Sequence, residues 1–501
     1  MSLRLSLTIS VALAGLAGAV HAQPRLHEAR IVTAHADGAA SVRRSPLVSP
    51  AESRDRSREA SDAGVCAVTP VDWQGQPLPD GESGTLNPQA FFHSATINNA
   101  GRIAFAAKVD GADRNQGIFT ADADGLHIVA MGCGDGGGTG NPGTCGDPTP
   151  IGGTFAGVFL DTFATPAIND NGDVLFISDV VDGSSSRGLF LYEAAEDTIV
   201  KIAAEGDPSP IGGTLTTLGM GSINNARTIV FIANTDDAVI SDILLWQDGV
   251  VTKYIASGDP VPGGGNFAML GTELWGYADG SFMAGGPIPA INEKGQIAFR
   301  GIVTGVAGTD RGLFLASGSE IEWLVRAGDE APGGGTYIDF QAPSLNNGGE
   351  IAFFADATDN SGWYAGSPGN WRRIVAGGEE IEGGSVDGFA ISRNPMSAIA
   401  DNGDVVVWVS RLVGNNDRGT TMIVHPDASI SILAVQGEDT GFGGIWGGSM
   451  DAWPTINDVG QVRMGSATPG FGDALSADVV FTLCSIDDTI FSDGFDDVPT
   501  N

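Results

Sequence analysis

Short runs in which every second residue is apolar recur along most of the chain, separated by glycine-rich turns. This alternation predicts β-strands that bury one face, because successive side chains of a strand point to opposite faces of the sheet. The pattern is clearest at 290–335, where an Asn-x-x-Gly turn is followed by expected strands at 296–303, 311–318 and 321–328. None of these units shows the 3.6-residue apolar period of an amphipathic helix. We therefore predict an all-β protein with almost no helix.

The Asn-x-x-Gly turn marks seven copies of one unit, at intervals of 54 to 71 residues. The copies begin at Asn98, Asn169, Asn224, Asn292, Asn346, Ala400 and Asn457. The third copy has Arg227 in place of Gly, and the sixth has Ala400 in place of Asn. Asn bonds its own backbone two residues on, and Gly accepts a left-handed conformation, so each turn is expected to close a hairpin. Each unit supplies three strand patterns after the turn and one before it.

Four short antiparallel strands per repeat are typical of a propeller blade. We predict a seven-bladed β-propeller over residues 65–484, with two consecutive smaller β-domains as the alternative. The last unit lacks a strand after Cys484, whereas residues 65–73 supply an extra strand before the first unit. We expect this N-terminal strand to join the last blade beside residues 477–483. Closure of this kind would remove an open sheet edge.

Four cysteines are expected to form two disulfides. Cys133 and Cys145 bracket a glycine-rich insertion and should pair with each other, because a staple would fix that loop. Cys66 should pair with Cys484, since the end of one antiparallel strand faces the start of its neighbour. The alternative for the second pair is two free, buried thiols. Export from the cell would permit both bonds.

The two ends of the chain differ from the repeats. Residues 1–22 contain Arg4, an apolar stretch from Leu5 to Val20 and a small-x-small site, which predict a signal peptide cleaved after Ala22. The stretch is shorter than the roughly 20 residues of a membrane span, so we expect a secreted or cell-surface protein without a transmembrane segment in the mature chain. Residues 23–64 lack apolar periodicity and are expected to be a disordered linker or pro-segment. Residues 485–501 form an acidic tail.

The net charge is −36, which argues against nucleic-acid partners because phosphate backbones would be repelled. Solubility of an exported protein accounts for this charge, and a specific cationic ligand is the alternative. We expect a monomer.

Three repeats share a longer pattern, reading NNAGRIAF at 98–105, NEKGQIAF at 292–299 and NNGGEIAF at 346–353. The pattern resembles the exported bacterial family named for its NxxGxxAF tandem repeats, whose members end in a choice of different surface anchors. The resemblance spans about residues 66–484. It implies an exported or surface-attached repeat protein and supplies no activity. The chain ends in the acidic TIFSDGFDDVPTN, unlike members that end in an apolar helix and a basic tail.

Equivalent turns of the form Gly-Asp-x-x-Pro carry one acid each, namely Asp147, Asp207, Asp259 and Asp329. In a closed ring these acids would form a partial crown, and oxygen ligands of that kind suit Ca²⁺. The alternative is that each Asp caps its own turn. No other cofactor is expected, because neither His-x-x-x-His nor Cys-x-x-Cys occurs. A Gly-x-Ser-x-Gly elbow for a nucleophilic serine is also absent from the sequence.

Four aromatic residues lie in the long segments before the next turn: Trp275, Tyr277, Trp446 and Trp453. Their rings suit stacking on sugars, and the alternative is packing between blades. Two functions follow. The first is a non-catalytic binding module for a glycan or a protein partner, favoured by the missing catalytic motifs and the sameness of the repeats. The alternative is an extracellular hydrolase or lyase acting on polysaccharide, which would need a suitably spaced carboxylate pair.

Overall fold

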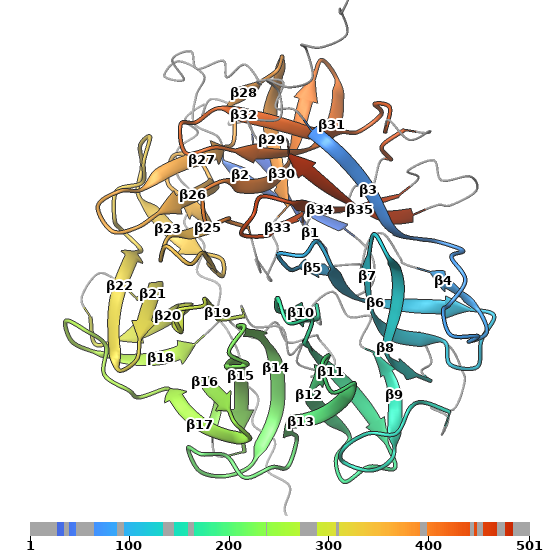
Figure 1. Cartoon of the computed structure of the whole chain (residues 1–501). Coiled ribbons are helices and arrows are strands. Elements are labelled where there is room, and N and C mark those ends of the chain that lie inside the picture. Colours follow the sequence, from blue (N-terminus) through green and yellow to red (C-terminus); the bar gives the residue numbers. More distant parts are fainter. Residues whose placement is uncertain are drawn as a thin grey trace, which may run out of the picture.

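Seven antiparallel sheets radiate from a central axis, each one blade of a propeller (Figure 1). The computed structural model describes residues 28–34, 40–46, 65–87, 95–133, 145–158, 165–236, 238–270, 288–306, 310–390, 398–440, 445–447, 454–467 and 476–483. This part of the chain contains strands and turns, and no helix in it is long and apolar enough to cross a membrane. The prediction of a seven-bladed propeller is confirmed.

The first four blades follow the chain in order. The first contains β4 (Thr85–Asn87), β5 (Ala95–Ile97), β6 (Ile103–Asp110), β7 (Gln116–Asp122) and β8 (Gly125–Gly132). The second contains β9 (Thr154–Val158), β10 (Ala167–Ile168), β11 (Val174–Val181), β12 (Arg187–Glu193) and β13 (Thr198–Ala204). The third contains β14 (Leu215–Ile223), β15 (Ile229–Thr235), β16 (Ala238–Gln247) and β17 (Val250–Ile255). The fourth contains β18 (Asn266–Leu270), β19 (Ala290–Ile291), β20 (Gln296–Thr304), β21 (Arg311–Ser317) and β22 (Glu320–Arg326).

The remaining blades complete the ring. The fifth contains β23 (Tyr337–Phe340), β24 (Ser344–Leu345), β25 (Ile351–Ala357), β26 (Gly362–Gly366) and β27 (Arg372–Ala376). The sixth contains β28 (Glu380–Ile381), β29 (Gly384–Ala390), β30 (Val405–Val413), β31 (Asn416–Val424) and β32 (Ile430–Val435). The seventh contains β33 (Thr455–Ile456), β34 (Val462–Ala467), β35 (Ser476–Leu483) and the N-terminal strand β3 (Val65–Trp73).

The innermost strand of several blades is divided into two short pieces. In the second blade, β9 and β10 pair with different parts of the same neighbouring strand, β11. The two pieces together occupy the place of one inner strand, so a four-stranded blade contains five strands. The third blade keeps one continuous inner strand, β14. The short piece next to the channel always leads into the Asn-x-x-Gly turn. The turns therefore close the hairpins that the sequence predicted.

The hydrophobic core lies between neighbouring blades rather than inside any one sheet. One cluster joins Ile118 of the first blade to Phe155, Phe176 and Phe190 of the second. Phe155 and Phe190 pack edge to face with ring centroids 5.2 Å apart, a favourable aromatic geometry. Central strands are covered on both faces, so they are nearly all apolar rather than strictly alternating.

The N-terminal strand closes the ring as predicted. β3 pairs antiparallel with β35, from Val65 opposite Leu483 to Trp73 opposite Ala477. Figure 1 shows the blue β3 beside the red β35, although these strands lie at opposite ends of the sequence. The last blade thus obtains its outermost strand from the start of the chain.

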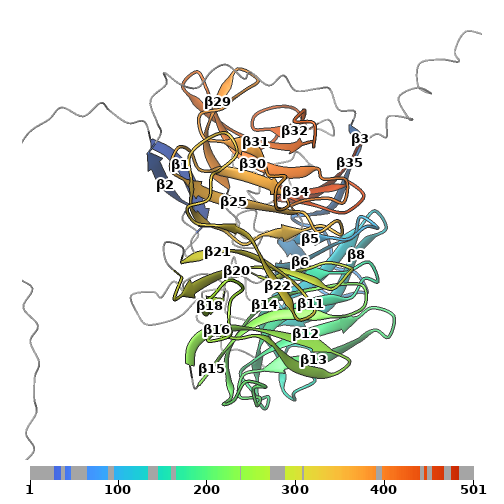
Figure 2. The same ribbon diagram turned by 90° about the vertical axis from the view of Figure 1, so that its left-hand side faces the viewer.

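Two further strands lie within 23–64, where we expected a linker. β1 (Glu28–Ala34) and β2 (Ala40–Pro46) form an antiparallel hairpin, and β1 runs parallel to β29 of the sixth blade (Figure 2). The consecutive β-branched residues Ile31, Val32 and Thr33 favour an extended chain. So short a run leaves the overall composition of residues 23–64 almost unchanged.

Candidate functional site at the channel mouth

Six asparagines of the repeated turns form a hydrogen-bonded ring around the central channel. Each side-chain Nδ2 donates to the backbone carbonyl of the equivalent residue in the next blade. The pairs are Asn98 to Asn169 at 3.0 Å, Asn169 to Asn224 at 3.2 Å, Asn224 to Asn292 at 3.2 Å, Asn292 to Asn346 at 3.0 Å, Asn346 to Ala400 at 3.1 Å and Asn457 to Asn98 at 2.8 Å. Ala400 has no amide, so the ring is interrupted between the sixth and seventh blades.

The same asparagines also shape their own turns. In Asn292, for example, Oδ1 accepts hydrogen bonds from the backbone N–H groups of Lys294 at 3.1 Å and Gln296 at 2.9 Å. One side chain therefore caps a turn and joins two blades at once. This double use explains why Asn, which has both a donor and an acceptor, recurs at the first position of the turn.

The residue after each of these positions lines the mouth of the channel. We call this set the rim: Asn99, Asp170, Asn225, Glu293, Asn347, Asp401 and Asp458. Rim side chains also connect blades, since the backbone N–H of Asn99 donates to Asp170 at 2.8 Å and that of Asp458 donates to Asn99 at 2.9 Å. The rim thus continues the blade-to-blade pattern one residue further out.

Amide groups of the rim lie between its carboxylates. Nδ2 of Asn99 donates to Asp170 at 2.9 Å and to Asp458 at 3.1 Å. Nδ2 of Asn347 donates to Asp401 at 3.1 Å and to Asp458 at 3.2 Å. The amide dipoles stabilise the neighbouring negative charges, so acids and amides form one connected network.

Carboxylates of the rim influence one another electrostatically. Partial burial raises the pKa of Glu293, and the charges of Asp170, Asp458 and Asp401 raise it further. Burial likewise raises the pKa of Asp458, with Asp401 and Asp170 adding to the shift, while a hydrogen bond from Asn99 opposes it. The four acids are therefore close enough for the charge of one to affect the pKa of another.

A cavity of about 110 Å³ opens inside these rings. It is lined by every rim residue except Asp401, by asparagines of the turns and by the residues that precede them, Ile97, Ile168, Ile223, Ile291, Leu345, Ile399 and Ile456. Four of these lining residues belong to the short inner strands β5, β10, β19 and β33, which lie near the centre of Figure 1. The arrangement offers hydrogen-bond acceptors and donors around a space whose exposed surface is largely polar.

A Ser–His–Asp arrangement occurs in the sixth blade, which the sequence analysis did not find. Nδ1 of His425 lies 2.7 Å from Oδ1 of Asp404, and Nε2 lies 2.6 Å from Oγ of Ser431. The bond to Asp404 raises the pKa of His425. Ser431 is 0% exposed, so no substrate carbonyl reaches its hydroxyl. These distances match a catalytic triad, but the burial gives the group a structural role in fixing the β31–β32 hairpin.

The four acids named as candidate calcium ligands each accept a backbone hydrogen bond in or beside their own turn, as the capping alternative expected. Asp207 accepts from the backbone N–H of Ala204 at 2.8 Å and from Nζ of Lys201 at 3.0 Å. Asp259 and Asp329 accept equivalent backbone bonds at 2.8 Å, and Asp147 accepts one at 2.7 Å. Across the described ranges, no group of three or more His, Cys, Asp or Glu side chains is placed to hold a metal ion. Local turn chemistry therefore accounts for Asp207, Asp259 and Asp329, whereas Asp147 accepts its backbone bond from Met131, sixteen residues earlier.

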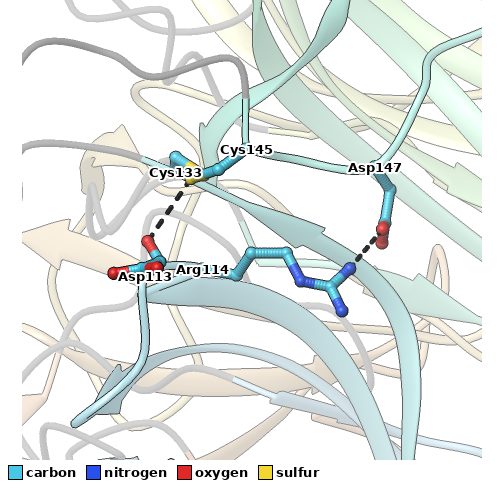
Figure 3. Close-up of a disulfide and its surroundings, with 5 residues drawn as sticks. All are labelled: Asp113, Arg114, Cys133, Cys145 and Asp147. Atoms are coloured by element: carbon cyan, nitrogen blue, oxygen red, sulfur yellow. Dashed lines mark hydrogen bonds and ion pairs between the residues drawn. A yellow bond between two sulfur atoms is a disulfide. The ribbon is translucent and has the colours of Figure 1, made fainter. Parts of the chain in front are cut away.

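The Cys133–Cys145 disulfide is confirmed, with the two α-carbons 5.8 Å apart. Figure 3 shows it near the contact between Arg114 and Asp147, whose Nη1 and Oδ1 atoms are 2.5 Å apart. The second predicted pair falls partly outside the described residues, because Cys484 follows the last of them. Cys66 lies in β3 next to Val65, whose partner is Leu483, the neighbour of Cys484.

Of the four aromatic candidates, the structure describes Trp446. It is 4% exposed and packs against Phe481 with ring centroids 5.9 Å apart, so it serves the core and is not open to a sugar. Trp275, Tyr277 and Trp453 lie outside the described residues. The rim is the polar site that sequence reasoning missed, although its position beside each repeated Asn was a usable signal.

Comparison with known proteins finds one family model and several solved structures. The profile of a family of unknown function (DUF7453) matches residues 143–277. No curated protein matches. Similar solved structures include the propeller domain of the Trilobed protease from Pyrococcus furiosus, with 10% identity over 67% of this chain and 92% of that one and a TM-score of 0.30. Regucalcin from Agrobacterium tumefaciens, a calcium-binding protein, has 11% identity over 64% of this chain and 88% of its own, with a TM-score of 0.29.

Proposed function

We propose that this protein is an exported or cell-surface repeat protein of the NxxGxxAF type, which binds a glycan without catalysis at the rim of its channel. The observation that carries the proposal is the rim itself. Three of its carboxylates, Asp170, Glu293 and Asp458, and its three amides line one cavity inside a closed ring of blades.

The chemistry of the rim suits sugar hydroxyls. Each hydroxyl both donates and accepts hydrogen bonds, and the rim presents carboxylate acceptors such as Asp170 beside amide groups such as Asn225. Bonds to ionised acceptors are stronger than bonds between neutral groups. Because the rim side chains are held by neighbouring blades, little side-chain freedom would be lost on binding.

The size of the cavity limits what enters it. A cavity of roughly 150 Å³ accommodates benzene. The cavity of about 110 Å³ therefore admits part of one sugar ring, and the remainder of a glycan would lie outside the mouth. We infer that the rim takes a terminal sugar residue rather than the middle of a buried chain.

Two features support export. The pattern of a signal peptide at 1–22 predicts secretion. The Cys133–Cys145 disulfide fits an oxidising compartment, because cytosolic thiols are usually kept reduced. The resemblance of the repeats to the exported family points the same way.

The test is a panel of glycans and polysaccharides, scored for binding and for turnover with the mature full chain. We expect binding without turnover. Asp170→Asn removes one rim charge and keeps the shape of the side chain, so we expect at least about a tenfold loss of affinity, equal to 1.4 kcal/mol. Asp248→Asn is the matched control, because Asp248 lies exposed in the turn between β16 and β17. This variant should bind the glycan with the affinity of the unmodified protein. Equal affinity of both variants would contradict the site, and turnover of a bound polysaccharide would favour the hydrolase or lyase alternative.

A further inference from the structure

The backbone hydrogen-bond donors of the rim are used within the rim itself. Six of its backbone N–H groups donate to the side chain of the rim residue in the next blade, over distances of 2.8 to 3.1 Å. The N–H of Asp170, for example, donates to Oδ1 of Asn225 at 2.8 Å, and that of Glu293 donates to Oδ1 of Asn347 at 2.9 Å. These backbone groups are therefore not free to donate to a ligand.

The side-chain amides of the rim are almost as fully used. An amide nitrogen carries two hydrogens. Those of Asn99 go to Asp170 at 2.9 Å and Asp458 at 3.1 Å, and those of Asn347 go to Asp401 at 3.1 Å and Asp458 at 3.2 Å. The third rim amide donates one hydrogen to Asp170 at 2.8 Å. Within the described part of the chain, this leaves a single amide hydrogen of the rim for a ligand.

Acceptors, in contrast, remain available at the mouth. A carboxylate has about four positions at which it can accept a hydrogen bond. Both amides that donate to Asp458 bond to its Oδ2, and no described residue donates to its Oδ1. One donor, Asn99, belongs to the first blade and the other, Asn347, to the fifth, so the Asp458 carboxylate reaches past the sixth blade into the mouth. The rim therefore presents acceptors and very few donors.

The negative charge in the cavity has no cation beside it. Asp170, Glu293 and Asp458 line the cavity, and none of the described lining residues is Lys, Arg or His. The bonds that these carboxylates accept come from neutral amide and backbone groups. Burial first, and then the charges of other rim acids, raise the pKa of Glu293 and of Asp458. A positive charge between the acids would oppose the second effect.

A primary ammonium group fits this combination better than a metal ion does. Across the described residues, no group of three or more His, Cys, Asp or Glu side chains is placed to hold a metal. An ammonium has three N–H donors and no acceptor, so it can bond to several separate oxygens at once. It is thus complementary to a mouth that is rich in acceptors, poor in donors and negatively charged.

We propose that the terminal sugar bound at the rim is an amino sugar with a free amine, whose ammonium group lies between Asp170, Glu293 and Asp458. The proposal rests on the glycan-binding function given above and names the class of sugar. N-acetylation removes the charge and two of the three N–H donors. A uronic acid would bring a further negative charge to the rim and would be repelled. Both are therefore poorer ligands.

Calorimetric titration of the mature full chain with short sugars tests this choice. The ligands are a glucosamine disaccharide, its N-acetylated counterpart and a galacturonic acid disaccharide, at about pH 6.5, where amines are protonated and ordinary carboxyl groups are ionised. We expect the free amine to bind at least about tenfold more tightly than the N-acetylated sugar, and the uronic acid to bind least. Equal or tighter binding of either comparison sugar overturns the proposal and leaves the glycan site in place. Failure of every glycan to bind rejects the proposed function and this inference with it.

Two variants separate the rim from the overall charge of the protein. Asp458→Asn and Asp248→Asn each remove one negative charge, but Asp248 lies exposed in the turn between β16 and β17. We expect Asp458→Asn to weaken binding of the amine about tenfold and to change binding of the N-acetylated sugar little, whereas Asp248→Asn should change neither. If thermal melting shows that Asp458→Asn does not fold, Glu293→Gln replaces it. Equal loss of amine affinity in the rim variant and the control would assign the attraction to the net charge of −36 and overturn the proposal.

Discussion

Arg227 donates to both carboxylate oxygens of Asp173, from Nε at 2.8 Å and from Nη2 at 3.0 Å. This bidentate pair joins the third turn to the second blade, and Arg227 also reaches Glu193 and Glu196 at 3.1 Å. Arg227 occupies the turn position that Gly holds elsewhere, with a φ of 58° in the left-handed region. The ion-pair network explains why a strained residue is retained where six other turns have glycine.

Replacement of Arg227 by glycine should lower the stability of the protein despite relieving this strain. Asp173 has a side chain that is 0% exposed, and the change would leave its carboxylate without a cation. Breaking such a pair costs about 3–5 kcal/mol when both partners are buried. The cost should be lower here because Arg227 is partly exposed, and relief of backbone strain stabilises the variant by about 1 kcal/mol. We therefore expect the free energy of unfolding in urea to fall by about 2 kcal/mol. The double variant Arg227→Gly, Asp173→Asn should recover part of the lost stability. Equal stability of Arg227→Gly and the unmodified protein would contradict this account.

The same pair predicts an acid dependence. Burial alone would raise the pKa of Asp173, but hydrogen bonds from Arg227 and Asn169 hold it below its usual value. A lowered folded pKa gives stability that is present above the unfolded value and lost as the pH falls through the folded one. Melting temperatures below about pH 4 should therefore fall less steeply in Asp173→Asn than in the unmodified protein. An equally steep fall of the melting temperature in both proteins would contradict this role of Asp173.

Removal of one ring asparagine should weaken the joint between two blades. Asn292→Ala deletes the donors to Gln296 at 2.9 Å and to the carbonyl of Asn346 at 3.0 Å, in a residue that is 4% exposed. Buried polar groups left without partners cost about 1–3 kcal/mol each. We expect a loss of about 2 kcal/mol by denaturant titration. Lys294→Ala, at an exposed position of the same turn, should change stability by less than about 0.5 kcal/mol.

The buried Ser431 should not react as a nucleophile. A fluorophosphonate probe labels activated serines, and we expect none on Ser431 in the folded protein because its hydroxyl is inaccessible. Ser431→Ala should instead lower stability by about 1 kcal/mol, since it removes the partner of Nε2 of His425. Stoichiometric labelling at this residue would show that the sixth blade opens to substrates and would revive the hydrolase alternative.

Much of the architecture follows from local chemistry that the sequence displays. The repeated Asn and Gly positions predict seven hairpin turns, and the missing strand after the last unit predicts closure by residues 65–73. The acids at Asp207 and Asp259 show the limit of this reasoning. Their partners are backbone groups three residues back, and such local bonds prevail over a long-range crown.

Sites assembled from distant segments were beyond the sequence patterns. Asp404, His425 and Ser431 form one network only after β30, β31 and β32 pair side by side in the sixth blade. The rim depends on the same principle, because five of its members contact the next blade across 54 to 71 residues of chain. Every residue has a backbone carbonyl, so the sequence does not reveal which carbonyl accepts the hydrogen bond of a turn asparagine.

The central claim is that strand β3 closes the ring by pairing with β35 of the last blade, and mapping of the disulfides tests it most directly. Val65 lies opposite Leu483, so Cys66 and Cys484 are predicted to be joined in the mature secreted protein. Digestion under non-reducing conditions should yield one linked peptide pair that contains both residues, and a second that contains Cys133 and Cys145. Two free thiols at Cys66 and Cys484, or a bond from Cys66 to any other cysteine, would contradict closure of the ring.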